Sequence, residues 1–150
     1  MNRLSGRVAL VTGASGGIGA AVARSLADQG VRLGLASRGG GDLGIDGSIA
    51  TACDVRDAAA VEAFVERVVG AFGQLDLVIA NAGVGAYGPF LELDPGHLEE
   101  MIDTNVKGVL YGIAETLPTF EAQGTGHVIN LSSIGGHTAF AGCGVYCASK

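Results

Sequence analysis

The stretch VALVTGASGGIGAAVA, Val8 to Ala23, constrains the fold more than any other part of the sequence. A short β-rich apolar run, Arg7 to Thr12, ends at a cluster of glycines, and apolar residues then recur every fourth position from Ile18. This change of period predicts a buried strand followed by a helix over Gly17 to Gln29. A second apolar run at Arg32 to Ala36 completes a βαβ unit, which implies two parallel strands joined by a right-handed crossover.

The rest of the chain continues this alternation. Three further apolar runs predict strands at Ile49 to Cys53, Leu77 to Ala80 and His127 to Leu131. Residues with helical spacing follow two potential N-caps, Asp57 and Asp94, whereas the turn-rich segment GGGDLGIDGS, Gly39 to Ser48, is expected to be a loop. We therefore expect residues 1–150 to form a single α/β domain with a doubly wound parallel sheet of Rossmann-type, dinucleotide-binding topology.

Composition excludes several classes of function. The net charge is −6 and basic residues form no cluster, so nucleic acid is not an expected partner. No apolar run approaches the ~18 residues that a membrane helix needs, so no membrane partner is expected either. The three cysteines show neither a CxxC pair nor a spacing suited to zinc, which predicts no metal site and favours a reducing cytoplasm.

The glycine cluster between the first strand and the first helix predicts a dinucleotide site. Glycines there allow a tight turn and a close backbone approach, and the free N–H groups at the helix start attract a pyrophosphate. An ordinary tight turn is the alternative reading. Ser37 and Arg38 follow the second strand, where an acidic residue would bind the 2′-hydroxyl of NAD and an arginine would pair with a 2′-phosphate. NADP(H) is therefore the preferred cofactor and NAD(H) remains possible, unless Arg38 is simply a solvated loop charge.

Tyr146 and Lys150 are four residues apart, which places them on one face of a helix. A free phenol loses its proton only near pH 10, but an ammonium about 4–5 Å away stabilises the phenolate by roughly 3–4 kcal/mol at an effective dielectric near 20. The pair is therefore suited to proton transfer at neutral pH. Ser133 lies thirteen residues before Tyr146, after the fifth strand, at the edge of the sheet where ligands of α/β proteins bind. The alternative for Tyr146 and Lys150 is an incidental pair on a helix surface. The alternative for Ser133 is a hydroxyl that satisfies backbone groups at the end of a strand.

These residues belong to a series of motifs that resembles the short-chain dehydrogenase/reductase family over the whole chain. The motifs, in order, are TGASGGIG at Thr12 to Gly19, CDV at Cys53 to Val55, NAG at Asn81 to Gly83, NVKG at Asn105 to Gly108, and NLSS followed by YCASK. The glycine spacing fits both simple reductases and sugar-nucleotide epimerases, whereas NAG and the NLSS-to-YCASK spacing favour the reductases. The short GGGDLGIDGS loop departs from the family, which usually has a helix there.

The resemblance implies a role for each motif. Tyr146 would be the general acid or base, Lys150 would assist it and hold the nicotinamide ribose, Ser133 would bind the substrate oxygen, and Asn105 would help anchor a water in the proton relay. Asn105 is also unusual in itself, as an amide on the apolar face of a predicted helix. The implied cofactor-binding residues are Gly13, Ser15, Gly17, Ile18, Gly19, Ser37, Arg38, Asp54, Val55, Asn81, Ala82, Gly83, Tyr146 and Lys150.

The implied activity is hydride transfer between NADP(H) and a small-molecule carbonyl or alcohol substrate. The alternative is a non-catalytic nucleotide-binding or interaction module with the same fold. Family members usually continue for about a hundred residues beyond this lysine, in line with ordinary domain sizes. From the resemblance we expect a truncated chain that lacks the last strands, part of the substrate site and much of the interface of a homo-oligomer.

Overall fold

The computed structural model describes residues 3–150 and confirms the doubly wound parallel sheet. Its strands are β1 Val8–Thr12, β2 Arg32–Ser37, β3 Ile49–Ala52, β4 Leu77–Ala80 and β5 His127–Asn130. Its α-helices are α1 Gly17–Ala27, α2 Ala58–Phe72, α3 Pro95–Ile102, α4 Gly108–Gln123 and α5 Gly144–Ser149. The strand order is β3-β2-β1-β4-β5 and every pairing is parallel, so the direction of winding reverses between β1 and β4.

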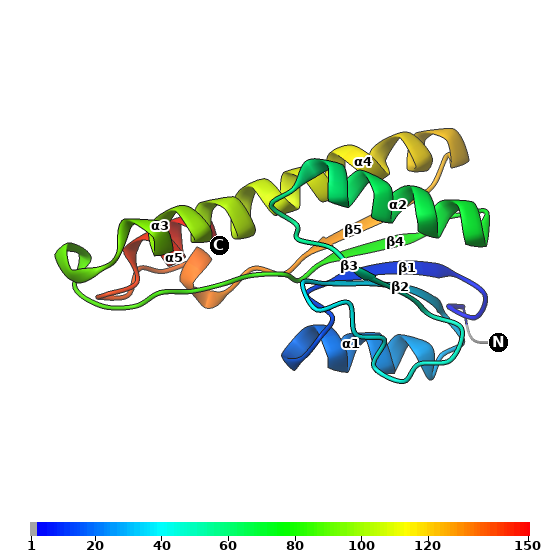
Figure 1. Ribbon diagram of the computed structural model, residues 1–150, viewed down its shortest axis with the longest axis horizontal. Helices are drawn as coiled ribbons and strands as arrows, with labels where there is room; N and C mark the ends of the chain where they lie inside the picture. The colour runs from blue at the N-terminus through cyan, green and yellow to red at the C-terminus, as the bar shows by residue number, and fades with distance from the viewer. Residues whose placement is uncertain (1–2) are drawn as a thin grey trace.

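Helices cover both faces of the sheet: α2 and α4 lie on one face and α1 lies on the other (Figure 1). The alternation of side chains along β1 builds both cores, because neighbouring residues of a strand point to opposite faces. Val8 and Leu10 pack in the cluster beneath α2 and α4, whereas Ala9 and Val11 pack in the cluster beneath α1. This is why the first strand appears in the sequence as an unbroken apolar run.

Helix boundaries follow the capping residues. The Asp57 side chain accepts hydrogen bonds from two backbone N–H groups at the start of α2, and Gly73, with φ of 74°, ends that helix. Asp94 caps α3, and Pro95 occupies its first turn. Both helix starts were predicted. Residues 39–48 form turns without a helix, as expected.

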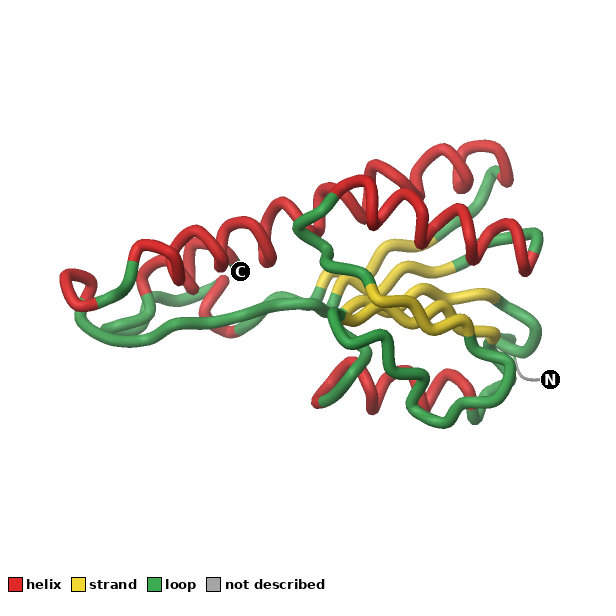
Figure 2. Tube along the Cα trace, in the orientation of Figure 1, coloured by secondary structure: helices red, strands yellow, loops and turns green. Residues whose placement is uncertain are grey.

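The long helical rod made by α3 and α4 contains one wide turn. Asp103–Lys107 is a π-helical turn in which the Gly108 N–H reaches back five residues to the Asp103 carbonyl. This turn, which the sequence pattern did not predict, contains Asn105. In Figures 1 and 2 the rod extends beyond the carboxyl ends of the strands, where α3 packs beside α5. Within residues 3–150 no helix is both long and apolar enough to cross a membrane.

Strand β5 forms one edge of the sheet over the described residues. Its Val128 and Ile129 side chains are 36% and 48% exposed. This edge of the sheet therefore carries partly exposed apolar side chains.

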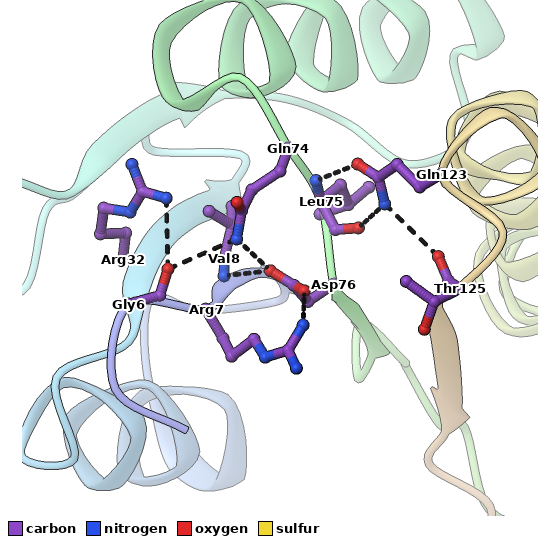
Figure 3. A network of polar contacts seen from close by, with 9 residues as sticks. All are labelled: Gly6, Arg7, Val8, Arg32, Gln74, Leu75, Asp76, Gln123 and Thr125. Atoms are coloured by element: carbon purple, nitrogen blue, oxygen red, sulfur yellow. Dashed lines mark hydrogen bonds and ion pairs between the residues drawn. The ribbon is translucent and has the colours of Figure 1, made fainter. Parts of the chain in front are cut away.

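A polar network holds the amino ends of the strands together, opposite the end where the functional site lies (Figure 3). The Asp76 carboxylate, just before β4, accepts hydrogen bonds from the Arg7 guanidinium, the Val8 N–H and the Gln74 side chain at 2.5, 2.8 and 2.7 Å. Burial by itself raises the pKa of Asp76, but these three donors outweigh it, so the pKa lies below its ordinary value. The ionised carboxylate thus joins β1 to β4.

A second side chain at this end links α4 to the sheet. Gln123, the last residue of α4, accepts a hydrogen bond from the Leu75 N–H at 3.0 Å and donates to the Leu75 carbonyl at 2.7 Å (Figure 3). Both bonds satisfy backbone groups of Leu75, whose side chain is fully buried. Gln123 therefore holds the end of α4 to the segment that precedes β4.

Candidate cofactor and active site

A cavity of about 630 Å³ opens at the carboxyl ends of the strands, next to the point where the winding reverses between β1 and β4. In open α/β sheets this position is where nucleotide ligands bind. The cavity is lined by loops that follow four strands and by α3 with the π turn: Gly13, Ser15, Gly16, Ile18, Ser37, Arg38, Gly39, Cys53, Asp54, Val55, Arg56, Asn81, Ala82, Gly83, Val84, Glu100 and Thr104.

The glycine loop forms a cradle that side chains would fill. Gly13 has φ of 65°, and a Cβ there would lie 2.9 Å from the Ala82 Cα. A Cβ on Gly19 would overlap the Gly13 carbonyl oxygen and the Asn81 amide. The loop therefore has this shape only with glycine at both positions. It leads into the N-terminus of α1, where the first N–H groups of a helix lack intrahelical partners and where Gly16 and Ile18 line the cavity. These residues fit a dinucleotide pyrophosphate.

Asn81 and Thr12 join the glycine loop to the segment after β4. The Asn81 amide donates to the Thr12 and Gly13 carbonyl oxygens at 2.9 and 3.2 Å. The Thr12 hydroxyl accepts from the Asn81 and Ala82 N–H groups, both at 3.1 Å. The NAG motif therefore supports the cofactor cradle, in addition to lining the cavity.

The residues that follow β2 and β3 lie at the rim of the cavity. The buried Ser37 hydroxyl accepts a hydrogen bond from the Gly40 N–H at 3.0 Å, which holds the turn after β2. Arg38 is more exposed, and its Nη1 lies 3.5 Å from Glu100 Oε1 on α3. Arg38 is thus a largely exposed loop residue with one long contact to α3.

Asp54, predicted to contact the adenine, is engaged by Arg56. Arg56 Nη2 lies 2.6 Å from Asp54 Oδ2, and the Arg56 backbone N–H and Nε also donate to the carboxylate. The Arg56 side-chain hydrogen bonds are the main reason that the pKa of Asp54 lies below its ordinary value. Arg56 Nη1 also lies 3.5 Å from Glu100 Oε1.

Cys53 lines the same cavity without a chemical role. Burial, followed by the nearby Asp54 and Asp57 charges, raises the pKa of the Cys53 thiol to about 11. The thiol therefore stays protonated at neutral pH and acts as a small apolar group. All three cysteines are free. No group of three or more His, Cys, Asp or Glu side chains in residues 3–150 is placed to hold a metal ion.

Asn105 connects the π turn to two other segments. Its Oδ1 accepts from the Val84 N–H at 2.9 Å, and its Nδ2 donates to the Val84 carbonyl at 2.9 Å and to Ser149 Oγ at 2.8 Å. The Ser149 hydroxyl in turn donates to the Tyr146 carbonyl oxygen at 2.9 Å. Both polar atoms of the amide that stood out on an apolar helix face are therefore hydrogen-bonded, and the amide fixes α5 against the loop after β4.

Lys150 reaches the same place from α5. Its ammonium donates to the Leu131 carbonyl oxygen at 2.9 Å, at the end of β5. A Cβ on Gly83 would lie 3.2 Å from Lys150 Nζ and 3.3 Å from Asn105 Oδ1. The lysine and the asparagine therefore meet at the backbone of the NAG motif, next to the cavity that Gly83 lines.

Tyr146 and Ser133 both approach Gly135. A Cβ on Gly135 would lie 3.3 Å from Tyr146 Cε1 and 3.5 Å from Ser133 Oγ. Ser133 Oγ accepts from the Gly135 N–H at 3.1 Å, which leaves the hydroxyl proton available to a ligand. The ring of Tyr87 packs edge to face on Tyr146 with centroids 5.4 Å apart. Burial raises the pKa of the Tyr87 phenol, and Tyr146 adds to the shift.

Most of the predicted cofactor residues line the cavity, but four do not. Gly17 and Gly19 lie at the start of α1, Tyr146 lies on α5 and Lys150 directly follows it, and none of the four lines the cavity. Three further side chains lie near this end of the molecule: Tyr87 contacts Tyr146, Phe90 lines a separate cavity of about 790 Å³ between α3 and α5, and His137 is exposed.

Sequence reasoning missed three polar residues of the cavity: Arg56, Glu100 and Thr104. Arg56 follows Asp54 by two positions, which was a visible signal. Glu100 and Thr104 are four residues apart and so share a helix face. However, no local pattern indicates that this face crosses the ends of β2 and β3.

Comparisons with known proteins agree with this geometry. A model of the short chain dehydrogenase family matches residues 7–150. An uncharacterized oxidoreductase of Staphylococcus haemolyticus is 40% identical over 100% of this chain and 68% of its own length. D-threitol dehydrogenase of Mycolicibacterium smegmatis is 35% identical over 99% of this chain and 60% of its own length.

A solved structure shares the fold. The crystal structure of a short chain dehydrogenase/reductase from Burkholderia phymatum in complex with NAD superimposes with a TM-score of 0.90 at 33% identity, covering 99% of this chain and 57% of that one. The chain thus spans about two thirds or less of the length of these proteins. The family match and the glycine cradle together support a nicotinamide dinucleotide as cofactor. The chain therefore belongs to the short-chain dehydrogenase family.

Proposed function

We propose that the protein is an NADP(H)-dependent oxidoreductase that interconverts a small-molecule carbonyl compound and its alcohol. The observation that carries the proposal is the meeting of Lys150, Asn105 and the Tyr146 helix at the NAG backbone, directly beside the cavity with the glycine cradle. The name of the Mycolicibacterium smegmatis relative, a D-threitol dehydrogenase, supports an alcohol or carbonyl as the substrate class.

Each proposed catalytic residue has one task. A bound nicotinamide supplies or accepts the hydride. The Tyr146 hydroxyl gives a proton to the substrate oxygen during carbonyl reduction and takes it back during alcohol oxidation. Lys150 is proposed to hold the nicotinamide ribose beside Tyr146, and Ser133 to donate its hydroxyl proton to the same substrate oxygen.

Asn105 is proposed to act mainly as a positioning residue. Its two amide protons are used by Val84 and Ser149, and its oxygen already accepts from the Val84 N–H. One lone pair of Oδ1 remains for a water of the proton relay. The stronger consequence of this bonding is that Tyr146 and Lys150 are carried on a helix whose position depends on Asn105.

The preference for NADP(H) rests on the end of β2. The residue directly after that strand is Arg38 rather than an acidic one, and Arg38 lines the cavity with its side chain largely exposed. A guanidinium suits a 2′-phosphate because it offers paired donors and a fixed charge. NAD(H) is the alternative cofactor, and the Burkholderia phymatum relative was crystallised with NAD.

The test is oxidation of NADPH with a panel of ketones and aldehydes, followed by absorbance. Tyr146→Phe is expected to lower turnover by at least about 100-fold, the usual contribution of a general acid, while NADPH binding stays within about twofold because Tyr146 lies outside the cavity wall. Tyr111→Phe is the matched control, because Tyr111 packs against the core beneath α4. Turnover that survives in Tyr146→Phe contradicts the proposed chemistry. NADPH binding without any turnover favours a non-catalytic module.

The proposal extends to assembly as a homo-oligomer and to a cytoplasmic location. Leu110 and Leu117 on α4 are 57% and 45% exposed, which fits a helix covered in a homo-oligomer. Light scattering of the purified protein measures this directly. The free Cys143 and Cys147 thiols suit a cytoplasmic location.

A further inference from the structure

Two arginines converge on one glutamate at the rim of the cofactor cavity. Arg38 follows β2, Arg56 follows β3, and Glu100 lies on α3, so three separate segments meet here. Arg38 Nη1 and Arg56 Nη1 each lie 3.5 Å from the same oxygen, Glu100 Oε1. All three side chains line the cavity. The glutamate therefore occupies the donors that an incoming anion would use.

The contacts made by Glu100 are weak enough to be displaced. Both distances exceed the roughly 2.7–2.9 Å of a strong charge-assisted hydrogen bond. The side chains of Arg38, Arg56 and Glu100 are 68%, 36% and 30% exposed, and solvent screens such pairs. Arg56, by contrast, holds Asp54 through several bonds at 2.6–3.0 Å. A ligand that replaces Glu100 thus leaves the link between Arg56 and Asp54 intact.

The local charges explain what kind of ligand competes. The two arginines are balanced by Glu100 and Asp54, so the rim carries no net charge. A phosphate monoester brings about −1.5 to −2 charges at neutral pH and three acceptor oxygens. It therefore satisfies two guanidinium groups better than the single oxygen of Glu100 does. A ribose 2′-hydroxyl brings no charge and gains nothing from displacing Glu100.

We propose that Glu100 is a specificity-determining residue that competes with the cofactor 2′-phosphate for Arg38 and Arg56, and so weakens the preference for NADPH over NADH. The inference rests on the proposed NADP(H) site and adds to it a second arginine and an internal competitor. Its direct consequence is that removal of the Glu100 charge strengthens the binding of NADPH alone.

The test compares the dissociation constants of NADPH and NADH in three proteins by titration calorimetry. Glu100→Gln keeps the size of the side chain and removes its charge, and is expected to tighten NADPH binding about five- to tenfold through the loss of charge repulsion. NADH binding is expected to change by less than about twofold, and the gain for NADPH shrinks at high salt. Glu99→Gln is the matched control, because Glu99 neighbours Glu100 on α3 but does not line the cofactor cavity.

A second variant identifies the partner. NADPH is expected to bind more weakly to Arg38→Ala than to the wild type. Adding Glu100→Gln to that variant is expected to tighten NADPH binding less than it does in the wild type, because only Arg56 remains to bind the phosphate. A full effect of Glu100→Gln without Arg38 shows that the two do not share a ligand, and overturns the inference. Thermal unfolding of each variant establishes that the differences come from folded protein.

The remaining outcomes separate this inference from the proposed function. Wild-type protein that binds NADPH, with Glu100→Gln equal to Glu99→Gln, overturns the role of Glu100 and leaves the proposed function standing. Weaker binding of NADH alone identifies Glu100 as an acceptor for the ribose hydroxyl, and equal weakening of both cofactors identifies a structural residue; both overturn the inference. Wild-type protein that binds neither dinucleotide overturns the proposed function and the inference together.

Discussion

Substitution of Asn105 by alanine is expected to destabilise the protein more than any other single change at the site. The variant loses three hydrogen bonds, to the Val84 N–H, the Val84 carbonyl and Ser149 Oγ. Asn105 is 6% exposed, so water replaces these bonds poorly. Each intramolecular hydrogen bond contributes about 0.5–1.5 kcal/mol. The expected loss in the free energy of unfolding is therefore about 2–4 kcal/mol.

This loss is measurable by thermal unfolding followed by circular dichroism. For a chain of this size a change of 1 kcal/mol shifts Tm by roughly 2–4 °C, so Asn105→Ala is expected to melt about 5–10 °C below wild type. Ser149→Ala removes one of the three bonds and is expected to cost about 1 kcal/mol. Asn130→Ala, on the exposed end of β5, is the matched control with no expected effect beyond about 0.5 kcal/mol.

A double-mutant cycle isolates the bond between α5 and the π turn. If Asn105 and Ser149 are bonded as described, the combined variant loses less stability than the sum of the two single variants, with a coupling of about 1 kcal/mol. Strict additivity, or an Asn105→Ala variant as stable as wild type, refutes the argument that Asn105 fixes α5 against the loop after β4.

Three further predictions test other parts of the molecule. Asp76→Asn is expected to lower the free energy of unfolding by about 1–2 kcal/mol at pH 7. Folding depresses the pKa of Asp76 below its ordinary value of 3.8. The extra stability of the wild type over the variant is therefore present above pH 3.8 and is lost as the pH falls below it. Urea titrations from pH 7 to pH 3 measure this, and an exposed Asp46→Asn control that shows the same pH trend contradicts it. Gly19→Ala is expected to abolish measurable NADPH binding, since its Cβ would overlap the Gly13 carbonyl oxygen; unchanged affinity in calorimetry speaks against the cradle. Gly70 lies inside α2, and a Cβ added there meets no atom within 4 Å. Gly70→Ala is therefore expected to raise the free energy of unfolding by about 0.5–1 kcal/mol, which a higher Tm would report.

The fold was predictable because its signals are local. The strand Val8–Thr12 is apolar on both faces because helices cover both, and Asp57 and Asp94 cap helices through backbone N–H groups only two or three residues away. The glycines of the first loop follow from the same local logic, since a positive φ at Gly13 needs a residue without a Cβ.

The site could be predicted from sequence only as a set of residues at strand and helix ends. For the loops this was almost enough to predict which residues lie together, because the carboxyl ends of parallel strands share one edge of the sheet. It was insufficient for Asn105, whose apolar surroundings marked it as unusual but whose partners, Val84 and Ser149, lie 21 and 44 residues away. The π turn that presents it has no local signature.

Tertiary structure alone decided how Glu100 is used. In the sequence it is one of two adjacent glutamates on a solvated helix face; in the fold it is the only one of the two that lines the cofactor cavity, within 3.5 Å of two arginines from distant loops. The sequence by itself therefore determined the strands, the helix starts and the glycine cradle, which depend on neighbouring residues. The contacts of Glu100 with Arg38 and Arg56 depend on how far α3 extends past the sheet, and that distance is decided by tertiary packing.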